Sequence, residues 1–148
     1  MAQVSGRGLM LSLAESCTGG LLAAVLTDVE GCSHGFDRGY VAYSDDAKHR
    51  LLGVSAHILE VHGAVSAQAA KAMVEGVLAA SAADIALSIT GFAGPGAAGE
   101  EPGLVYFGVQ FRSRSARVER RRFGETSRAA VRLSSLRTSL SLLFEEVG

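Results

Sequence analysis

The chain contains 148 residues, 48% of them hydrophobic, with 18 Gly, 2 Pro and no Trp. A chain of this size and composition can bury a core without disulfides or metals, which excludes the disordered and fibrous classes. The 14 Lys and Arg residues nearly balance the 15 Asp and Glu residues, for a net charge of −1. Because this gives no strong overall field, we expect no nucleic acid or anionic membrane as a partner, and local contacts must hold any charged ligand.

The two cysteines, Cys17 and Cys32, do not stand at a spacing typical of metal sites. We expect both to be reduced thiols, and we expect no metal. No apolar stretch approaches the roughly 20 residues of a membrane-spanning helix. Met1–Leu13 also lacks the layout of a secretion signal. The sequence therefore predicts a soluble, cytoplasmic protein.

Strand and helix patterns alternate along the first 90 residues. Apolar or β-branched runs predict strands at Gly8–Ala14, Phe36–Tyr43 and Asp84–Thr90. Helix-forming stretches are Leu21–Thr27, a segment from the N-cap Ser44 to about Leu52, Ser55–His62, and Ala67–Ala80 behind the cap Ser66. In the last of these helices, Met73, Val77 and Ala80 are expected on one face.

The second half begins with a glycine-rich loop, Gly91–Gly103, and continues with a β-hairpin and a long helix. The hairpin strands are expected at Leu104–Arg112 and Arg117–Phe123, and the helix at Thr126–Glu146. Together the elements predict an α/β fold, a single three-layer α/β/α domain over residues 1–148 with a mixed sheet. Ligands of such sheets collect at the carboxyl ends of the strands.

Ser16 falls at one of these ends, in the segment Glu15–Gly20, where a buried strand passes into a helix. Free amides and the positive end of a helix dipole could there bind an oxyanion or a phosphate. On this segment alone, the commoner explanation is that Ser16 or Thr18 caps the helix. Cys17 is a rival nucleophile, because a helix N-terminus lowers the pKa of a thiol.

Lys48 strengthens the case for Ser16. It falls in the first turn of its predicted helix, where a cation opposes the dipole. Such a place, together with burial, lowers the pKa of a lysine, as a general base requires. Tyr43 ends the preceding strand and could relay or stabilise charge at the same point. The alternative is an exposed Lys48 and a Tyr43 at the edge of the core.

The third turn, Thr90–Gly96, offers several amides after a buried strand and could bind a phosphate or an amide. By itself a glycine-rich loop is a weak signal, and ordinary turn chemistry is the commoner explanation. Neither a GxGxxG nor a Walker pattern is present, so no nucleotide cofactor is expected. Arg38 could reach a substrate phosphate or form a structural ion pair. The arginines of the hairpin are expected on a solvated face rather than on nucleic acid.

Four ordered motifs carry a family resemblance: AESCTGG at Ala14–Gly20, YSDDAK followed by LLGV at Tyr43–Val54, HGAVS at His62–Ser66, and TGFAGPG at Thr90–Gly96. They closely resemble the family of the CinA C-terminal domain, which includes stand-alone nicotinamide-nucleotide amidases. The resemblance runs from about Ala14 to Arg132.

The resemblance implies a three-layer α/β homo-oligomer that deamidates a small-molecule substrate, nicotinamide mononucleotide, to nicotinic acid mononucleotide and ammonia without a metal or cofactor. By this resemblance, Ser16 is the nucleophile, Lys48 the base and Tyr43 a helper. The ligand-binding candidates are Thr18, Gly19, Gly20, Arg38, Thr90, Gly91 and Gly94. We expect amides at the start of the Gly19-Gly20 helix to stabilise the oxyanion, and Lys48 to act directly or through Tyr43.

Two departures from the family pattern stand out. Only about eight residues precede the first strand, so the helix usual there is expected to be missing or displaced. The usual Phe-x-Gly-Asp-Arg appears here as Phe123–Arg128, FGETSR, which alters or shifts the contact of that Asp-Arg pair. Two other functions stay open: a non-catalytic nucleotide-sensing or partner-binding module, and an amidase for another small amide.

Overall fold

The computed structural model describes residues 1–95 and 98–148 and contains a five-stranded mixed sheet in the order β2-β1-β3-β4-β5. The first three strands in this order are parallel, and β4 and β5 are antiparallel to their neighbours. The strands are β1 (Leu11–Glu15), β2 (Phe36–Val41), β3 (Ile85–Gly91), β4 (Leu104–Phe111) and β5 (Arg117–Arg122). The helices are α1 (Ala2–Gly6), α2 (Leu21–Thr27), α3 (Asp45–Leu52), α4 (Ala56–His62), α5 (Ala67–Ala79) and α6 (Arg128–Val147), with a 3-10 turn, η1, at Ser33–Gly35.

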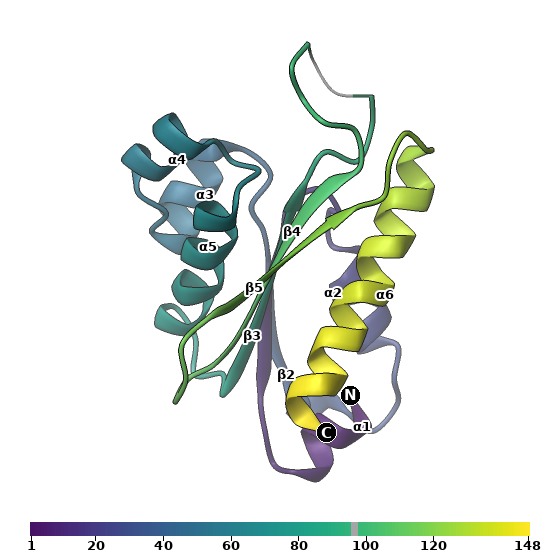
Figure 1. Cartoon of the computed structure of the whole chain (residues 1–148). Helices are drawn as coiled ribbons and strands as arrows, with labels where there is room; N and C mark the ends of the chain where they lie inside the picture. The colour runs from purple at the N-terminus through teal and green to yellow at the C-terminus, as the bar shows by residue number, and fades with distance from the viewer. Residues whose placement is uncertain (96–97) are drawn as a thin grey trace.

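Helices cover both faces of the sheet, as predicted (Figure 1). α3, α4 and α5 lie on one face, and α1, α2 and α6 lie on the other. Side chains alternate along each strand, so Leu13 joins the core under α2 and α6, whereas Ala14 joins the core under α5. Every residue of β1 is buried, which explains its continuous apolar pattern.

Most predicted elements are present with small shifts at their ends. The first strand begins at Leu11 rather than Gly8, since residues before it turn out of the sheet. The long helix begins at Arg128, where the Ser127 side chain accepts a hydrogen bond from the Ala130 amide. Ala80 is exposed beyond the end of α5 and does not join Met73 in the core, which corrects the expectation for that face.

The expected loss of the helix before the first strand is also corrected. A short helix, α1, is present, and its Val4 is buried in the core. The Leu9 amide donates to the Val4 carbonyl and so returns the chain toward β1. Gly96 and Ala97 of the predicted glycine-rich loop lie outside the described residues. In the described part of the chain, no helix is long and apolar enough to cross a membrane.

A close contact between α3 and α5 fixes where Lys48 lies. A Cβ atom on Gly76 of α5 would stand 1.9 Å from the Leu52 carbonyl oxygen of α3, so only glycine permits this approach. Leu52 is the last residue of α3, and its side chain packs with Val74 and Val77 in the core. The contact holds α3 against α5, with Lys48 on the buried side of α3.

Candidate active site

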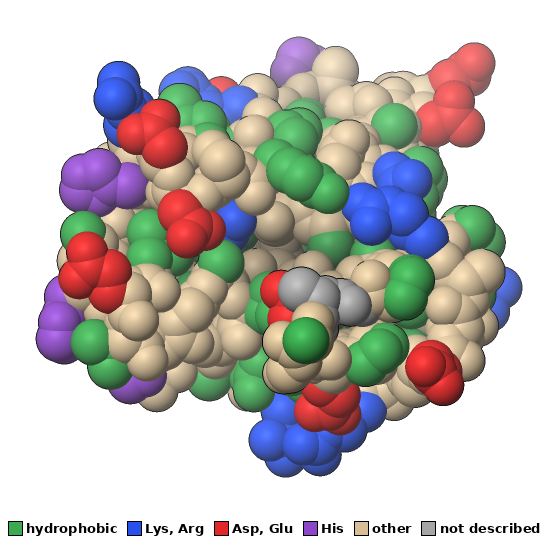
Figure 2. All heavy atoms as spheres, turned by 90° about the horizontal axis from the view of Figure 1, so that it is seen from above, with side chains coloured by type: hydrophobic (Ala, Val, Ile, Leu, Met, Phe, Trp, Pro, Cys, Tyr) green, Lys and Arg blue, Asp and Glu red, His purple; other side chains and the backbone are tan. Residues whose placement is uncertain are grey.

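A cavity of about 370 Å³ opens at the carboxyl ends of β1 and β3, where the three turns singled out in the sequence converge. Figure 2 looks onto this end of the molecule, where the surface is hollowed and a basic side chain stands at the edge of the hollow. The residues around the cavity are Ser16, Cys17, Tyr43, Lys48, Ala64, Val65, Thr90, Gly91, Phe92, Ala93, Gly94, Pro95, Glu100 and Arg128.

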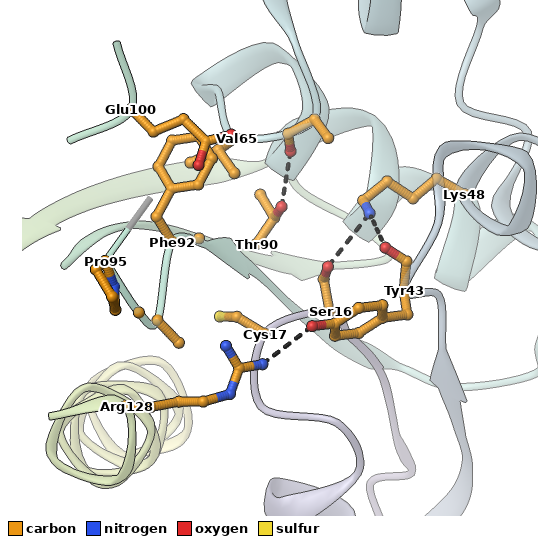
Figure 3. Close-up of a pocket in the computed structure, with 14 residues that line it drawn as sticks. Ser16, Cys17, Tyr43, Lys48, Val65, Thr90, Phe92, Pro95, Glu100 and Arg128 are labelled. Carbon is orange, nitrogen blue, oxygen red and sulfur yellow. Dashed lines mark hydrogen bonds between the residues drawn. The ribbon is translucent and has the colours of Figure 1, made fainter. Parts of the chain in front are cut away.

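Ser16 and Lys48 meet at the floor of this cavity (Figure 3). Ser16 follows β1 directly, and its amide donates to the Ile89 carbonyl of β3, which fixes the start of the turn. Lys48 Nζ donates to Ser16 Oγ and to the Tyr43 carbonyl oxygen, both at 3.2 Å. Only 1% of Lys48 and 7% of Ser16 are exposed. A serine hydroxyl is therefore in direct contact with a buried amine.

Burial lowers the pKa of Lys48, because a charged ammonium loses its hydration there. Asp45 in the same helix partly opposes this shift. Lys48 also lies in the first turn of α3, whose N-cap is Ser44, as the sequence predicted. A lysine of lowered pKa is neutral over a wider pH range and can then accept the proton of Ser16.

Tyr43 contacts the pair through its backbone and not through its phenol. Its carbonyl accepts from Lys48, whereas its hydroxyl accepts from Arg128 Nη2 at 3.0 Å. The side chain points along the cavity toward Arg128 (Figure 3). Among the described residues, no hydrogen bond joins the phenol to Ser16 or Lys48, and the relay through Tyr43 stays a prediction.

Arg128 is a cavity residue that the sequence reasoning did not assign to the site. It is the first residue of α6, where a cation opposes the helix dipole. The same signal pointed to Lys48 and could have identified Arg128. A Cβ on Gly94 would lie 3.7 Å from Arg128 Nη1, so the glycine-rich loop and the arginine meet at one wall of the cavity.

Glu15 occupies the amides that were expected to hold the oxyanion. Its buried carboxylate accepts hydrogen bonds from the amides of Gly20, Leu22 and Ala23 at 3.2, 3.0 and 2.8 Å. The Leu21 amide donates to the Thr18 carbonyl. The start of α2 is therefore capped from inside the protein, and the expectation of an oxyanion site there is wrong.

The turn residues Thr18, Gly19 and Gly20 do not line the cavity, although they were ligand-binding candidates. Thr18 is fully buried, and its carbonyl accepts from Arg132 Nη2 at 2.9 Å. Gly19 and Gly20 have φ angles of +61° and +93°, which glycine adopts without strain. Their role in this structure is to shape the turn that presents Ser16.

Thr90 and Gly91 end β3 at the cavity, as expected of the third turn. The Thr90 hydroxyl donates to the Ala64 carbonyl at 2.7 Å, which ties the segment before α5 to the sheet. A Cβ on Gly91 would lie 2.8 Å from the Leu104 carbonyl oxygen, so glycine is required there. The loop then contributes Phe92 and Pro95, two apolar side chains that the sequence reasoning did not single out.

Arg38 is not brought to the cavity. It forms an ion pair with Asp37 at 2.8 Å and donates to the Ala80 carbonyl beyond the end of α5. Of its two predicted roles, the structural ion pair is the one present. Arginines of the hairpin also form ion pairs: Arg117 lies 3.0 Å from Glu145, and Arg122 contacts Glu101.

Cys17 lines the cavity beside Ser16, but burial raises its pKa to about 11. Little thiolate then exists near neutral pH, which argues against Cys17 as the nucleophile. Over residues 1–95 and 98–148, no three His, Cys, Asp or Glu side chains gather closely enough to hold a metal ion.

The comparisons with known proteins agree on one family. The model of the CinA C-terminal domain matches residues 1–147. A protein of Enterobacter agglomerans named nicotinamide-nucleotide amidohydrolase PncC is 45% identical over 98% of this chain and 89% of its own length. A putative competence-damage inducible protein of Caldicellulosiruptor bescii is 44% identical over 94% of this chain. The chain spans only 34% of the length of that relative.

Solved structures agree with the sequence comparison. The competence/damage inducible protein CihA from Agrobacterium tumefaciens superposes with a TM-score of 0.94 at 42% identity, over 97% of this chain and 88% of that one. A CinA superfamily protein from Klebsiella pneumoniae gives a TM-score of 0.92 at 39% identity, over 98% and 91%.

Proposed function

The chain belongs to the family of the CinA C-terminal domain, and we propose that it is a serine amidohydrolase that deamidates nicotinamide mononucleotide. The observation that carries the proposal is the contact of the buried Lys48 amine with the Ser16 hydroxyl in an open cavity. The relative named nicotinamide-nucleotide amidohydrolase, 89% of whose length the chain covers, supports the choice of substrate.

In the first half-reaction, neutral Lys48 removes the proton of Ser16, and Ser16 Oγ attacks the carboxamide carbon of the substrate. The tetrahedral intermediate collapses when the Lys48 ammonium returns the proton to the amide nitrogen and ammonia leaves. An ester to Ser16 remains. Water then attacks this ester with Lys48 again as base, which releases the carboxylic acid and restores the Ser16 hydroxyl.

The oxyanion of the intermediate must be held by donors other than the start of α2. The Cys17 amide follows Ser16 directly in the chain and donates to no backbone carbonyl among the described residues. Cys17 lines the cavity, whereas the fully buried Thr18 does not. We therefore assign the oxyanion to the Cys17 amide, in place of the amides that Glu15 occupies.

The side chains that line the cavity suit the chemical groups of a pyridine mononucleotide. Phe92 and Pro95 offer apolar surface for a ring, and Arg128 offers a guanidinium for the phosphate. Gly94 lies beside Arg128 and allows the loop backbone to approach the same group. The volume of about 370 Å³ lies within the usual range for a small-molecule site.

The test is ammonia release from nicotinamide mononucleotide, measured together with formation of the carboxylic acid product. We expect the wild-type protein to be active, Ser16→Ala to be inactive and Cys17→Ser to remain active. Full activity of Ser16→Ala would refute the mechanism. Absence of wild-type activity together with tight nucleotide binding would favour the sensing module, and hydrolysis of other amides alone would favour a different amidase.

The exposed face of α6 supports the expectation of a homo-oligomer. Leu133, Leu140 and Phe144 are 54%, 36% and 63% exposed along this helix. Such apolar side chains are common at contacts between identical subunits. Light scattering of the wild type and of Phe144→Glu tests the homo-oligomer. We expect a lower molecular mass for the variant, and a monomer mass for both proteins would exclude the homo-oligomer.

A further inference from the structure

Two arginines of α6 reach the active-site turns, and only one of them lines the cavity. Arg128 and Arg132 are four residues apart and so project from the same side of the helix. Arg128 donates to the Tyr43 hydroxyl, whereas Arg132 donates to the Thr18 carbonyl in the turn that follows Ser16. Arg132 is not a cavity residue, so it acts on the site only through the chain it contacts.

The contact of Arg132 does not serve to satisfy the Thr18 carbonyl. That oxygen already accepts from the Leu21 amide at 3.2 Å. Moreover, Arg132 Nε and Thr18 Oγ1 are both buried without a hydrogen-bond partner among the described residues. Unpaired buried polar atoms lower stability, and an apolar side chain of similar length would avoid the loss. Stability alone therefore gives no reason for an arginine here.

The position of the contact between Arg132 and the Thr18 carbonyl suggests that it orients the turn that follows Ser16. The Thr18 carbonyl lies between the Cys17 amide, which is assigned to the oxyanion, and the glycines that lead into α2. Glu15 holds the α2 side of this turn through the Gly20 amide, and Arg132 holds the Ser16 side through the Thr18 carbonyl. Rotation of the peptide that joins Ser16 and Cys17 would move the Cys17 amide away from the oxyanion, and a shift of about 1 Å can reduce a rate on the order of 100-fold.

We propose that Arg132 is a positioning residue that orients the Ser16 turn, residues 16–20, so that the Cys17 amide meets the oxyanion. The proposal rests on the proposed serine mechanism, in which this amide acts. Arg132 touches neither the substrate nor Ser16. Its loss changes the rate of the chemical step, leaves substrate affinity in place and does not destabilise the fold.

The test compares Arg132→Met with Arg132→Lys and with the control Arg137→Met, which removes an exposed arginine from the same helix. For Arg132→Met we expect kcat to fall by about 10- to 100-fold, KM to change less than about twofold, and the unfolding midpoint to match that of the control. Arg132→Lys keeps one donor for the Thr18 carbonyl and should recover part of kcat. An unchanged kcat in Arg132→Met overturns the proposal. A lower kcat together with a lower unfolding midpoint than that of Arg137→Met also overturns it, because loss of stability would then explain the lower rate.

Hydrogen exchange gives a measurement that does not depend on catalysis. The Leu21 amide donates to the Thr18 carbonyl that Arg132 also contacts. It should exchange faster in Arg132→Met than in Arg137→Met, while the core strands keep their protection. If the wild type proves inactive on the nucleotide, the proposed function fails, and exchange alone decides the role of Arg132. Equal exchange in both variants overturns it.

Discussion

Lys48 Nζ lies 3.2 Å from Ser16 Oγ, and the two residues come from turns 32 positions apart in the chain. The contact depends on α3 lying close to α5 and on β1 delivering Ser16 at the end of a buried strand. Neither residue is exposed enough for bulk water to hydrate it well. The chemistry of the pair therefore differs from that of a surface lysine and serine.

The pH dependence of activity should follow Lys48. Its pKa is lowered by burial, so the neutral base forms at a lower pH than in a free lysine. We expect kcat/KM to rise with pH through this lowered pKa. Lys48→Arg should lose about 10²- to 10⁴-fold in kcat, because a guanidinium stays protonated. A pH–rate profile measures both, and the assignment fails if Lys48→Arg keeps the wild-type rate and profile.

The stability of the fold should respond to the same residue. Below the ordinary lysine pKa, the unfolded chain binds a proton at Lys48 more readily than the folded chain does, so this group favours unfolding. The unfavourable contribution shrinks as pH rises toward the ordinary pKa. We expect Lys48→Met to unfold at a higher urea concentration than the wild type at pH 7, and the gain to be smaller at pH 10. Equal midpoints at both pH values would contradict this.

Glu15→Gln should weaken both the fold and the active site. The carboxylate accepts from the amides of Gly20, Leu22 and Ala23, whereas an amide side chain brings a donor group against those donors. We expect a loss of about 2–4 kcal/mol in the free energy of unfolding. The control is Glu30→Gln at an exposed position. Chemical denaturation measures the difference, and equal stability of the two variants would refute the cap.

Arg128→Met should raise KM more than it lowers kcat, if Arg128 binds the substrate phosphate. A hydrogen bond to a charged group contributes about 1.5–3 kcal/mol, which corresponds to an increase in KM of roughly 10- to 100-fold. Nicotinamide riboside, which lacks the phosphate, should be hydrolysed equally by variant and wild type. A KM unchanged for the nucleotide would place the phosphate elsewhere.

Gly76→Ala should disturb the active site from a distance. The added Cβ would meet the Leu52 carbonyl oxygen at 1.9 Å and push α3 from α5, and Lys48 would move with it. We expect a destabilisation of about 1–3 kcal/mol and a reduced kcat. Gly6→Ala is the control, because a Cβ on that helical glycine meets nothing within 4 Å. Equal stability and equal kcat in Gly76→Ala and Gly6→Ala would exclude a role of the contact between α3 and α5 in placing Lys48.

The sequence predicts the elements well where patterning and capping are local. Ser44 and Ser66 cap their helices as expected, because the capping bond spans only three residues. Local patterns also identified residues that the structure places at one cavity: Ser16, Tyr43, Lys48, Thr90, Gly91 and Gly94. Pattern alone could place these residues at strand ends, and the parallel arrangement of β1, β2 and β3 made those ends meet.

What the sequence could not predict depends on contacts between distant segments. The Glu15 carboxylate accepts from the amides of three residues, and only the folded turn reveals these contacts. The partner of the Tyr43 phenol, Arg128, lies 85 residues away. Arg38 could equally have faced a ligand, and its pairing with Asp37 decided the matter.

The internal cap formed by Glu15 also bears on product release. Hydrolysis of a carboxamide turns a neutral group into a carboxylate, and a free helix start beside Ser16 would bind that new anion. Because Glu15 already fills the start of α2, the acid formed at Ser16 finds those amides closed to it. We therefore expect weak inhibition by the product acid, so that each turnover leaves the site ready for the next amide.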